Sequence, residues 1–275
     1  MSGSQTEIAH ITLVGDRAEN QDRALILEDT DCCLLALGDG LGGHPQGDVA
    51  AQILMDTCAR LWSEAHKPLL NPSYFLQQCM LQAHRAIVSY GAAQVPPVSP
   101  RTTAVLALLQ EGECYWSHAG DSRFYLVREE AVHRVSRDHV VANDASGLYS
   151  PGENPAAITR CLGGSARSIA PALGAPVALR AGDVVLLCSD GFWNQLDETQ
   201  MLTVLHNALP LENALGILGE MAVENRSGQS DNVTAVGIRL GHDSFGVGRH
   251  PLLEDEESEL LMAIEHLNRL IEKTL

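Results

Sequence analysis

The sequence predicts an α+β fold in which antiparallel β-sheets are covered by pairs of helices. Short apolar runs follow one another with only brief polar turns between them, which is typical of strands joined in hairpins. Apolar residues at helical spacing mark two pairs of helices, one around residues 50–61 and 76–87 and the other around 197–208 and 211–225. Because hairpins alternate with helix pairs, antiparallel sheets are favoured over repeated parallel crossover units.

The predicted strands follow in order along the chain. The first hairpin joins Ala24–Leu27 to Cys32–Leu37 across a polar turn. Further strands are expected at Thr102–Leu109, Cys114–His118, Phe124–Val127, Val132–Val135, Val184–Cys188 and Val233–Leu240. Asn71 followed by Pro72 suits the cap and first turn of the second helix. Residues 139–180 are rich in Gly, Pro and Ala without a clear period, and this predicts an irregular surface segment.

Composition narrows the class of protein. The 275 residues, 45% of them hydrophobic, can bury a substantial core, most simply as one domain. A formal charge of -17 argues against binding nucleic acid or an anionic membrane, because both need a basic face. No apolar run approaches the roughly 20 residues of a membrane span, and the N-terminal residues lack the pattern of a signal peptide. Since the seven cysteines also show no C-x-x-C pair, we expect a cytoplasmic protein with reduced thiols.

Four aspartates lie at the ends of predicted strands. Asp39, Asp121 and Asp190 each follow an apolar run, and Asp231 comes just before one. If these strand ends share one edge, several ionised carboxylates converge there and repel one another strongly. A divalent cation relieves that repulsion, and all-oxygen ligation favours Mg²⁺ or Mn²⁺ over zinc. Any single Asp-Gly pair is more often a simple turn, so it is the set of four that predicts a metal centre.

Six short motifs occur in order along the chain. They are RAENQD at residues 17–22, GDGLGGH at 38–44, RTT at 101–103, GDSR at 120–123, SDGFW at 189–193 and DNVT at 231–234. Over residues 10–240 this set resembles the bacterial branch of the metal-dependent protein phosphatases, the protein phosphatase 2C-type (PPM) family. The resemblance implies a four-layer α-β-β-α sandwich with two central antiparallel β-sheets. It also implies a protein serine/threonine phosphatase that hydrolyses phosphoserine and phosphothreonine and opposes a bacterial Ser/Thr kinase.

The resemblance further implies a set of metal ligands. Asp39 would bridge two Mn²⁺ or Mg²⁺ ions, and Asp190 and Asp231 would complete the site of one of them. The carbonyl of Gly40, a residue whose missing side chain lets the backbone pass close to the ions, would join the other site. Asp121 would help to hold a third, more labile ion.

Two more residues take roles from the family's motifs. Arg17 resembles the phosphate clamp, a task that suits arginine because its planar guanidinium can give two hydrogen bonds to a phosphoryl group. Outside its motif, Arg17 would be interpreted as a surface arginine in a turn. Asp22 resembles the acid that orients metal-bound water. No protein nucleophile is needed, because two cations lower the pKa of a bridging water and stabilise charge on the phosphoryl oxygens.

The sequence departs from the wider family at several positions. Gln21 stands where many members have Glu, and Asn194 stands where eukaryotic members place another acid. Leu41 stands where eukaryotic relatives carry a histidine proposed as general acid, so the proton must come from metal-bound water or another group. His44 is a candidate donor, although a structural role in the glycine loop is the simpler interpretation. The Gly-rich segment 139–160 corresponds to the family's flap and is short.

Two other phosphate-related patterns occur in the sequence. Gly38–Gly43 formally satisfies the G-x-G-x-x-G dinucleotide fingerprint of a dehydrogenase. The hairpin partner before this segment and the two helices after it do not make a βαβ unit, however, and an acid between the glycines would face the pyrophosphate. Cys161–Arg167 fits the C-x-x-G-x-x-R loop of cysteine-dependent phosphatases, but Pro171 and Pro176 argue against the helix that must follow such a loop. A packed thiol is the simpler interpretation of Cys161.

A non-enzymatic alternative is a phosphatase-like domain that only binds a phosphoprotein or a regulator. Loss of a bridging acid would favour that interpretation. Asp39, Asp121, Asp190 and Asp231 are all retained, and their presence together favours the enzyme.

The chain changes character near its C-terminus. We expect residues 1–241 to form the phosphatase domain and residues 242–275 to form a linker and an amphipathic helix. An acidic run at 254–257 precedes one apolar helical stripe, which consists of Leu260, Ile264, Leu267, Ile271 and Leu275. The helix either packs back on its own domain, which is the favoured interpretation, or recruits a partner such as a cognate Ser/Thr kinase or a scaffold.

Overall fold

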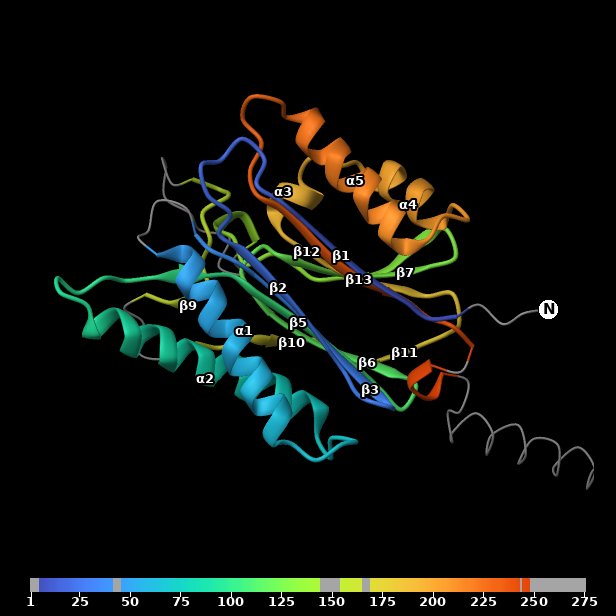
Figure 1. Ribbon diagram of the computed structural model, residues 1–275, viewed down its shortest axis with the longest axis horizontal. Coiled ribbons are helices and arrows are strands. Elements are labelled where there is room, and N and C mark those ends of the chain that lie inside the picture. The colour runs from blue at the N-terminus through green and yellow to red at the C-terminus, as the bar shows by residue number, and fades with distance from the viewer. Residues whose placement is uncertain (1–4, 42–45, 144–153, 165–168, 243, 248–275) are drawn as a thin grey trace, which may run out of the picture.

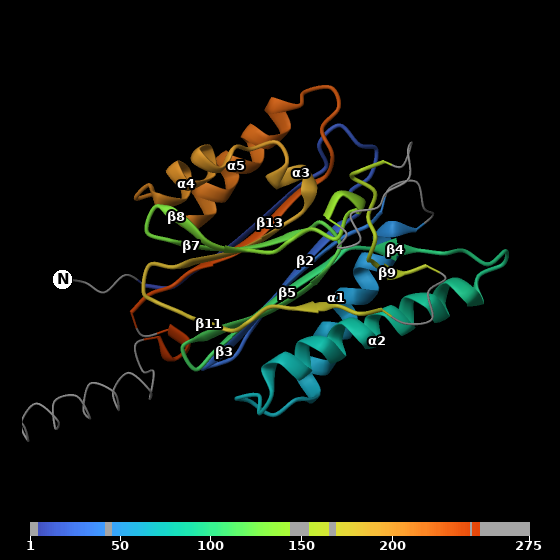
Figure 2. The same cartoon turned by 180° about the vertical axis from the view of Figure 1, so that it is seen from behind.

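The protein folds as four layers, with helices outside and two β-sheets inside (Figures 1 and 2). The computed structural model describes residues 5–41, 46–143, 154–164, 169–242 and 244–247. Helices α1 (Gly47–Glu64) and α2 (Pro72–Ala93) cover the outer face of one sheet. The short α3 (Asp190–Trp193), α4 (Glu198–His206) and α5 (Leu211–Asn225) lie on the outer face of the other. The predicted α-β-β-α sandwich is thereby confirmed.

The first sheet is built from strands of the N-terminal half and two short later strands. Its spatial order is β10-β6-β5-β3-β2, with β11 also pairing with β6, and every pair is antiparallel. The bounds are Asp22–Glu28 (β2), Cys32–Asp39 (β3), Ala104–Gln110 (β5), Glu113–Ala119 (β6), Ala172–Leu173 (β10) and Val177–Ala178 (β11).

The second sheet joins the N-terminal strand to the C-terminal one. Its order is β1-β13-β12-β7-β8, again antiparallel throughout. The bounds are Glu7–Leu13 (β1), Arg123–Arg128 (β7), Ala131–Val135 (β8), Val184–Cys188 (β12) and Val233–Arg239 (β13). A separate pairing joins β4 (Arg101–Thr102) to β9 (Leu162–Gly163). The chain passes directly from the first sheet to the second between β6 and β7.

The central strands are apolar on both faces because each sheet is covered on both sides. Along β3, Leu35 and Leu37 pack between the two sheets, whereas Leu34 and Ala36 pack toward α1 and α2. Strand β5 alternates in the same way. These strands therefore appear in the sequence as unbroken apolar runs, and the position of each strand end is fixed by two layers of packing.

Local sequence signals fix the helix ends. The side chain of Asn71 accepts a hydrogen bond from the Tyr74 N–H at 2.9 Å, and Pro72 opens α2 as predicted. Helix α4 begins with reciprocal hydrogen bonds between Asp197 and Gln200. The four helices of the two predicted pairs are confirmed, and α1 and α2 extend beyond the predicted apolar stripes.

The strands differ from the sequence prediction in three places, and the prediction does not include the short helix α3. Strand β1 is missing from the prediction, because Glu7–Leu13 mixes polar and apolar residues as an edge strand does. The predicted strand at 102–109 is interrupted at Thr103, whose N–H donates to the Asp39 carbonyl. The predicted irregular segment 139–180 supplies the short strands β9, β10 and β11, which pair with β4 and β6.

The last described residues continue the packing of the domain. Phe245 and Val247 contact the apolar layer between the sheets. The predicted amphipathic helix falls within residues 248–275, outside the described residues, so that helix and the boundary at residue 241 stay predictions. Within the described ranges, no helix has the length and apolar character needed to cross a membrane.

Truncation of a leucine between the sheets should destabilise the protein strongly. Leu187 on β12 is fully buried there, so Leu187→Ala should lower the free energy of unfolding by about 2–5 kcal/mol, as the two sheets cannot close the cavity. Leu70→Ala makes the same change at a fully exposed side chain and should change it by less than about 0.5 kcal/mol. Urea titration measures both, and equal effects would contradict the inter-sheet position of Leu187.

Candidate metal centre

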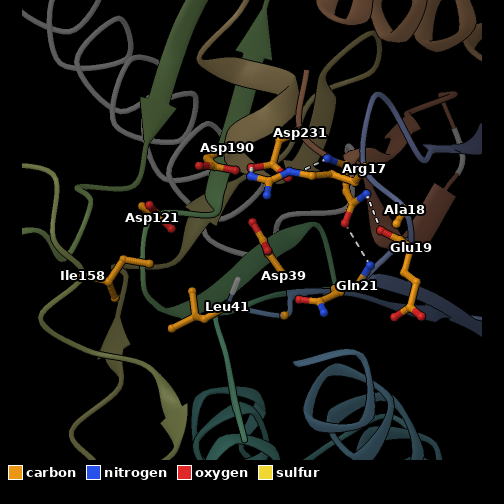
Figure 3. Close-up of a pocket in the computed structure, with 12 residues that line it drawn as sticks. Arg17, Ala18, Glu19, Gln21, Asp39, Leu41, Asp121, Ile158, Asp190 and Asp231 are labelled. Carbon is orange, nitrogen blue, oxygen red and sulfur yellow. Dashed lines mark hydrogen bonds and ion pairs between the residues drawn. The ribbon is translucent and has the colours of Figure 1, made fainter. Parts of the chain in front are cut away.

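A pocket opens at one end of the sandwich, where strands of both sheets end (Figure 3). Asp39 is the last residue of β3, and Asp121 lies in the turn from β6 to β7. Asp190 is the first residue of α3, two residues after the end of β12, and Asp231 lies two residues before β13. All four side chains line this pocket. The structure thus brings the four aspartates to one edge, as the strand ends predict.

The carboxylates crowd one another in a partly buried site. Burial raises the pKa of Asp39 well above its ordinary value, and the charges of Asp22 and Asp190 raise it further. The pKa of Asp190 is raised by burial and by Asp231, while a hydrogen bond with Asp39 partly offsets the rise. The pocket therefore contains more acidic groups than can stay ionised together without added positive charge.

Asp121 has an oxygen without a partner. Burial raises the pKa of Asp121 to about 7, with Asp190 adding to the rise. The Oδ1 atom of Asp121 is buried and makes no hydrogen bond. Because a buried polar atom without a partner is costly, this oxygen points to a ligand that would supply the missing interaction.

A tightly packed backbone delivers Asp39 to the pocket. The Asp39 N–H donates to Thr103 Oγ1 at 3.0 Å, and the Thr103 N–H donates to the Asp39 carbonyl at 2.8 Å. The next residue must be glycine, because a Cβ at position 40 would lie 2.4 Å from the carbonyl carbon of Gly47 at the start of α1. This close approach explains the Asp-Gly pair, and it leaves Gly40 lining the pocket.

Arg17 lies at the rim of the pocket, in the loop between β1 and β2. Its side chain is 55% exposed, and its Nη2 donates to Asp231 Oδ2 at 2.7 Å (Figure 3). This hydrogen bond, with the charge of Asp231, raises the pKa of Arg17. The guanidinium therefore adds a permanent positive charge on the solvent side of the acidic pocket.

Asp22, the first residue of β2, lies behind the pocket. It is only 3% exposed, and its Oδ2 accepts a hydrogen bond from the Ser189 hydroxyl at 2.9 Å. Burial raises the pKa of Asp22 to about 7, and Asp190 and Asp231 contribute to the rise. Its Oδ1 has no hydrogen-bond partner. The acid is thus tied to the residue that precedes Asp190.

The donors of the pocket suit a hard divalent cation. Three carboxylates, those of Asp39, Asp190 and Asp231, come together with the backbone at Gly40, so all the available donors are oxygens. In the described part of the chain, no three His, Cys, Asp or Glu side chains are placed so that they could hold one metal ion by themselves, so an ion here would also need water or other oxygen ligands. An open set of this kind fits Mg²⁺ or Mn²⁺, because such ions keep several waters and use few carboxylates.

The positions that depart from the family pattern fall in different places. Leu41 and Gln21 line the pocket, and the Gln21 N–H donates to the side chain of Asn232 at 2.9 Å. Asn194 is the C-cap residue that follows α3, and its N–H donates to the Asp190 carbonyl. His44 lies outside the described residues.

The structure adds pocket residues that the sequence analysis does not single out. Asn232 and Glu19 line the pocket, and both lie within motifs that contain other site residues, so their positions carried a signal. Ile158 also lines it, opposite Arg17 (Figure 3). Because Ile158 comes from the irregular segment, no periodic pattern marked it.

The two rival phosphate patterns do not fit the structure. Burial raises the pKa of the Cys161 thiol, whereas a nucleophilic cysteine needs a lowered one. The loop itself contains strand β9 at Leu162–Gly163, and the described residues that follow it, 169–173, lead into strand β10 and form no helix. Strand β3 pairs antiparallel with β2 and β5, which is not the parallel βαβ unit of a dinucleotide site.

Comparison with known proteins agrees with this geometry. The family described as protein phosphatase 2C matches residues 14–215. The chain is 27% identical over 248 residues to protein phosphatase PhpP of Streptococcus pneumoniae, covering 86% of this chain and 98% of that protein. It is 32% identical over 246 residues to serine/threonine protein phosphatase PstP of Mycobacterium tuberculosis, covering 83% of this chain and 46% of that longer protein. The catalytic domain of PstP, solved in complex with two manganese ions, aligns with a TM-score of 0.70 at 28% identity, covering 85% of this chain and 97% of that one.

Taken with these relatives, the four-layer fold and the acidic pocket at its edge define a protein phosphatase. Because the family match at residues 14–215 covers more than half of the chain, the chain belongs to the protein phosphatase 2C family. The predicted enzyme class is thereby confirmed, and the binding-only alternative is not favoured.

Removal of divalent cations should make stability depend on pH. In EDTA, the native protein keeps protons on Asp22 and Asp121, whose pKa is about 7, at pH values where the unfolded chain, with an ordinary value of 3.8, has released them. The native state binds more protons between these two pKa values, so its stability should be highest at the acidic side and fall as the pH rises from about 4 to about 7. Thermal melts across that range measure the trend.

Two asparagine variants test the source of this slope. Asp22→Asn cannot ionise and should melt with a shallower pH slope than the unmodified protein. Asp56→Asn changes an exposed acid on α1, remote from the pocket, and should leave the slope unchanged. If Asp22→Asn had the same pH slope as the unmodified protein, Asp22 would not be the buried acid that keeps its proton in the native state.

Proposed function

We propose that the protein hydrolyses phosphoserine and phosphothreonine in other proteins with two Mn²⁺ or Mg²⁺ ions held in this pocket. Asp39 would bridge both ions, Asp190 and Asp231 would complete one site, and the Gly40 carbonyl would join the other. Asp121 would help to hold a third, more labile ion. The observation that carries this proposal is the convergence of acids from both sheets, where burial and mutual repulsion raise the pKa of Asp39 and Asp190. The two manganese ions in PstP support it.

When bound, the ions supply an activated water and positive charge that stabilises the phosphoryl oxygens during in-line displacement. Arg17 would hold the phosphoryl group at the solvent side of the pocket. A guanidinium has five N–H donors and uses one of them on Asp231, so donors remain for two parallel bonds to phosphate. Such a clamp would fix the group for attack from the side of the carboxylates.

Asp22 would orient the attacking water from behind the carboxylates. Its Oδ2 is occupied by the Ser189 hydroxyl, but its Oδ1 has no partner and can accept a hydrogen bond. Leu41 lines the pocket without any group that can donate a proton. We therefore propose that the leaving seryl or threonyl oxygen takes its proton from water in the pocket.

The setting of the enzyme is also a proposal. We infer that it acts in the cytoplasm on proteins phosphorylated by a cognate Ser/Thr kinase, with neither nucleic acid nor membrane as a partner. All seven cysteines are free thiols, as a reducing compartment favours, and the net charge of -17 disfavours anionic surfaces. Residues 1–241 would form the catalytic domain, and the helix predicted within 242–275 would pack on it or recruit the kinase or a scaffold.

Hydrolysis of a phosphothreonine peptide tests the central proposal. Activity should require added Mn²⁺ or Mg²⁺, disappear in EDTA and resist thiol alkylation. Asp39→Asn and Asp190→Asn should each lower kcat by about 100-fold or more, because each removes a group that holds the charge stabilising the transition state. Asp56→Asn and Cys161→Ser should retain activity. Activity that survives EDTA but is lost in Cys161→Ser would overturn the metal mechanism.

Loss of the proposed phosphate clamp should weaken binding of the substrate. Arg17→Ala should raise KM by about 10- to 100-fold, because charged hydrogen bonds to the phosphoryl group are lost. Arg60→Ala removes an exposed arginine of α1 that pairs with Glu64, and it should leave KM unchanged. Steady-state kinetics on the same phosphopeptide separate KM from kcat, and an unchanged KM in Arg17→Ala would exclude the clamp.

A further inference from the structure

The turn that carries Asp121 is held by hydrogen bonds on both sides. The His139 N–H donates to the Gly120 carbonyl at 2.9 Å, and the Gly120 N–H donates to His139 Nδ1 at 3.3 Å. On the other side, Ser122 is buried and its hydroxyl lies 2.6 Å from that of Thr103. The residues before and after Asp121 are therefore fixed to two separate parts of the fold.

Trp193 links this turn to α3. Its indole Nε1–H donates to the carbonyl of Asp121 at 2.9 Å. Trp193 is the last residue of α3, and the first residue of that helix is Asp190. One helical turn thus carries both an acid of the pocket and the donor that holds the backbone of a second acid. The indole hydrogen bond therefore sets Asp121 in place relative to Asp190.

The Trp193 ring is itself held in position by Arg123. The guanidinium carbon of Arg123 lies 3.2 Å from the ring centroid, which is a cation–π contact. Both oxygens of Asp138 accept hydrogen bonds from the same guanidinium, each at 2.8 Å. Because this bidentate pair fixes the guanidinium plane, it also fixes the ring stacked on it.

The backbone of Asp121 is held by hydrogen bonds, whereas one oxygen of its carboxylate has no partner. The carboxylate lines the pocket, and its buried Oδ1 makes no hydrogen bond (Figure 3). A ligand residue with a rigid backbone and a free oxygen is preorganised for a cation, since little freedom is lost when the ion binds.

We propose that Trp193 is a positioning residue for the accessory cation at Asp121, acting through the indole hydrogen bond to the Asp121 carbonyl. This inference rests on the proposed function, which places a third ion at Asp121. Loss of a bond that orients a metal ligand typically weakens metal affinity by about 10- to 100-fold. The indole N–H makes no bond to the side chains of the core ligands, so the two core ions should bind as before.

A purely structural role for Trp193 makes a different prediction. The ring packs against the apolar layer beneath α4 and α5, so its loss could lower stability without any selective effect on one ion. The decisive measurement is therefore the affinity of each ion, in protein shown to be folded by circular dichroism.

Titration of the full chain with Mn²⁺, followed by the electron paramagnetic resonance signal of the free ion, tests the inference. The unmodified protein should bind two ions tightly and a third more weakly, and Asp121→Ala should abolish the third. Trp193→Phe should weaken the third ion by about 10- to 100-fold and leave the first two unchanged. Trp116→Phe is the matched control, because the buried Nε1 of Trp116 has no hydrogen-bond partner.

A second substitution separates the hydrogen bond from the packing. Benzothienylalanine at position 193 keeps the two-ring shape of tryptophan but has sulfur in place of the N–H, and it should weaken the third ion as Trp193→Phe does. Normal affinity with this residue, or an equal loss at all three ions in Trp193→Phe, would overturn the inference while the proposed function stands. A third ion that is missing from the unmodified protein would overturn the accessory site itself, and the inference with it.

Discussion

Crowding of like charge at an edge shared by two sheets is the constraint on which the rest of the site depends. Asp39 arrives from one sheet and Asp190 and Asp231 from the segments that flank the other, and burial makes their mutual repulsion costly. Two features of the surrounding structure stabilise these acids: a fixed positive charge and hydrogen bonds that hold their backbone. The guanidinium of Arg17 contacts Asp231 from the solvent side of the pocket. The Thr103 hydroxyl accepts a hydrogen bond from the Asp39 N–H and so holds the backbone of that acid.

The four layers explain why such a cluster can persist. Strands β3 and β5 are packed on both faces, so their ends cannot drift to relieve the repulsion. The short range contacts near the pocket add to this rigidity: the Ser189 hydroxyl joins Asp22 to the start of α3, and Trp193 joins the end of α3 to the β6–β7 turn. The stability of the layers thus maintains an arrangement that is unfavourable taken alone.

Sequence patterns predict those parts of the molecule that local physics determines. Each of the four pocket acids lies beside an apolar strand, so a short stretch of sequence is enough to mark it. The helix cap at Asn71 is a local signal of the same kind. Edge strand β1 is missing from the prediction because a half-buried strand, in which polar and apolar residues are mixed, gives only a weak pattern. Contacts such as Arg17 with Asp231, or Trp193 with Asp121, join segments distant along the chain, so no local pattern could specify them.

The apolar layer between the two sheets has a role beyond stability, because the chain passes from one sheet to the other and the pocket acids come from both. Asp39 moves with one sheet, and the segments carrying Asp190 and Asp231 move with the other, so the thickness of the layer between them sets the separation of the acids. A displacement of about 1 Å among reacting groups can cost about 100-fold in rate. Residues such as Leu187 are therefore expected to vary less during evolution than packing alone requires, because a substitution there also changes the spacing of the acids in the pocket.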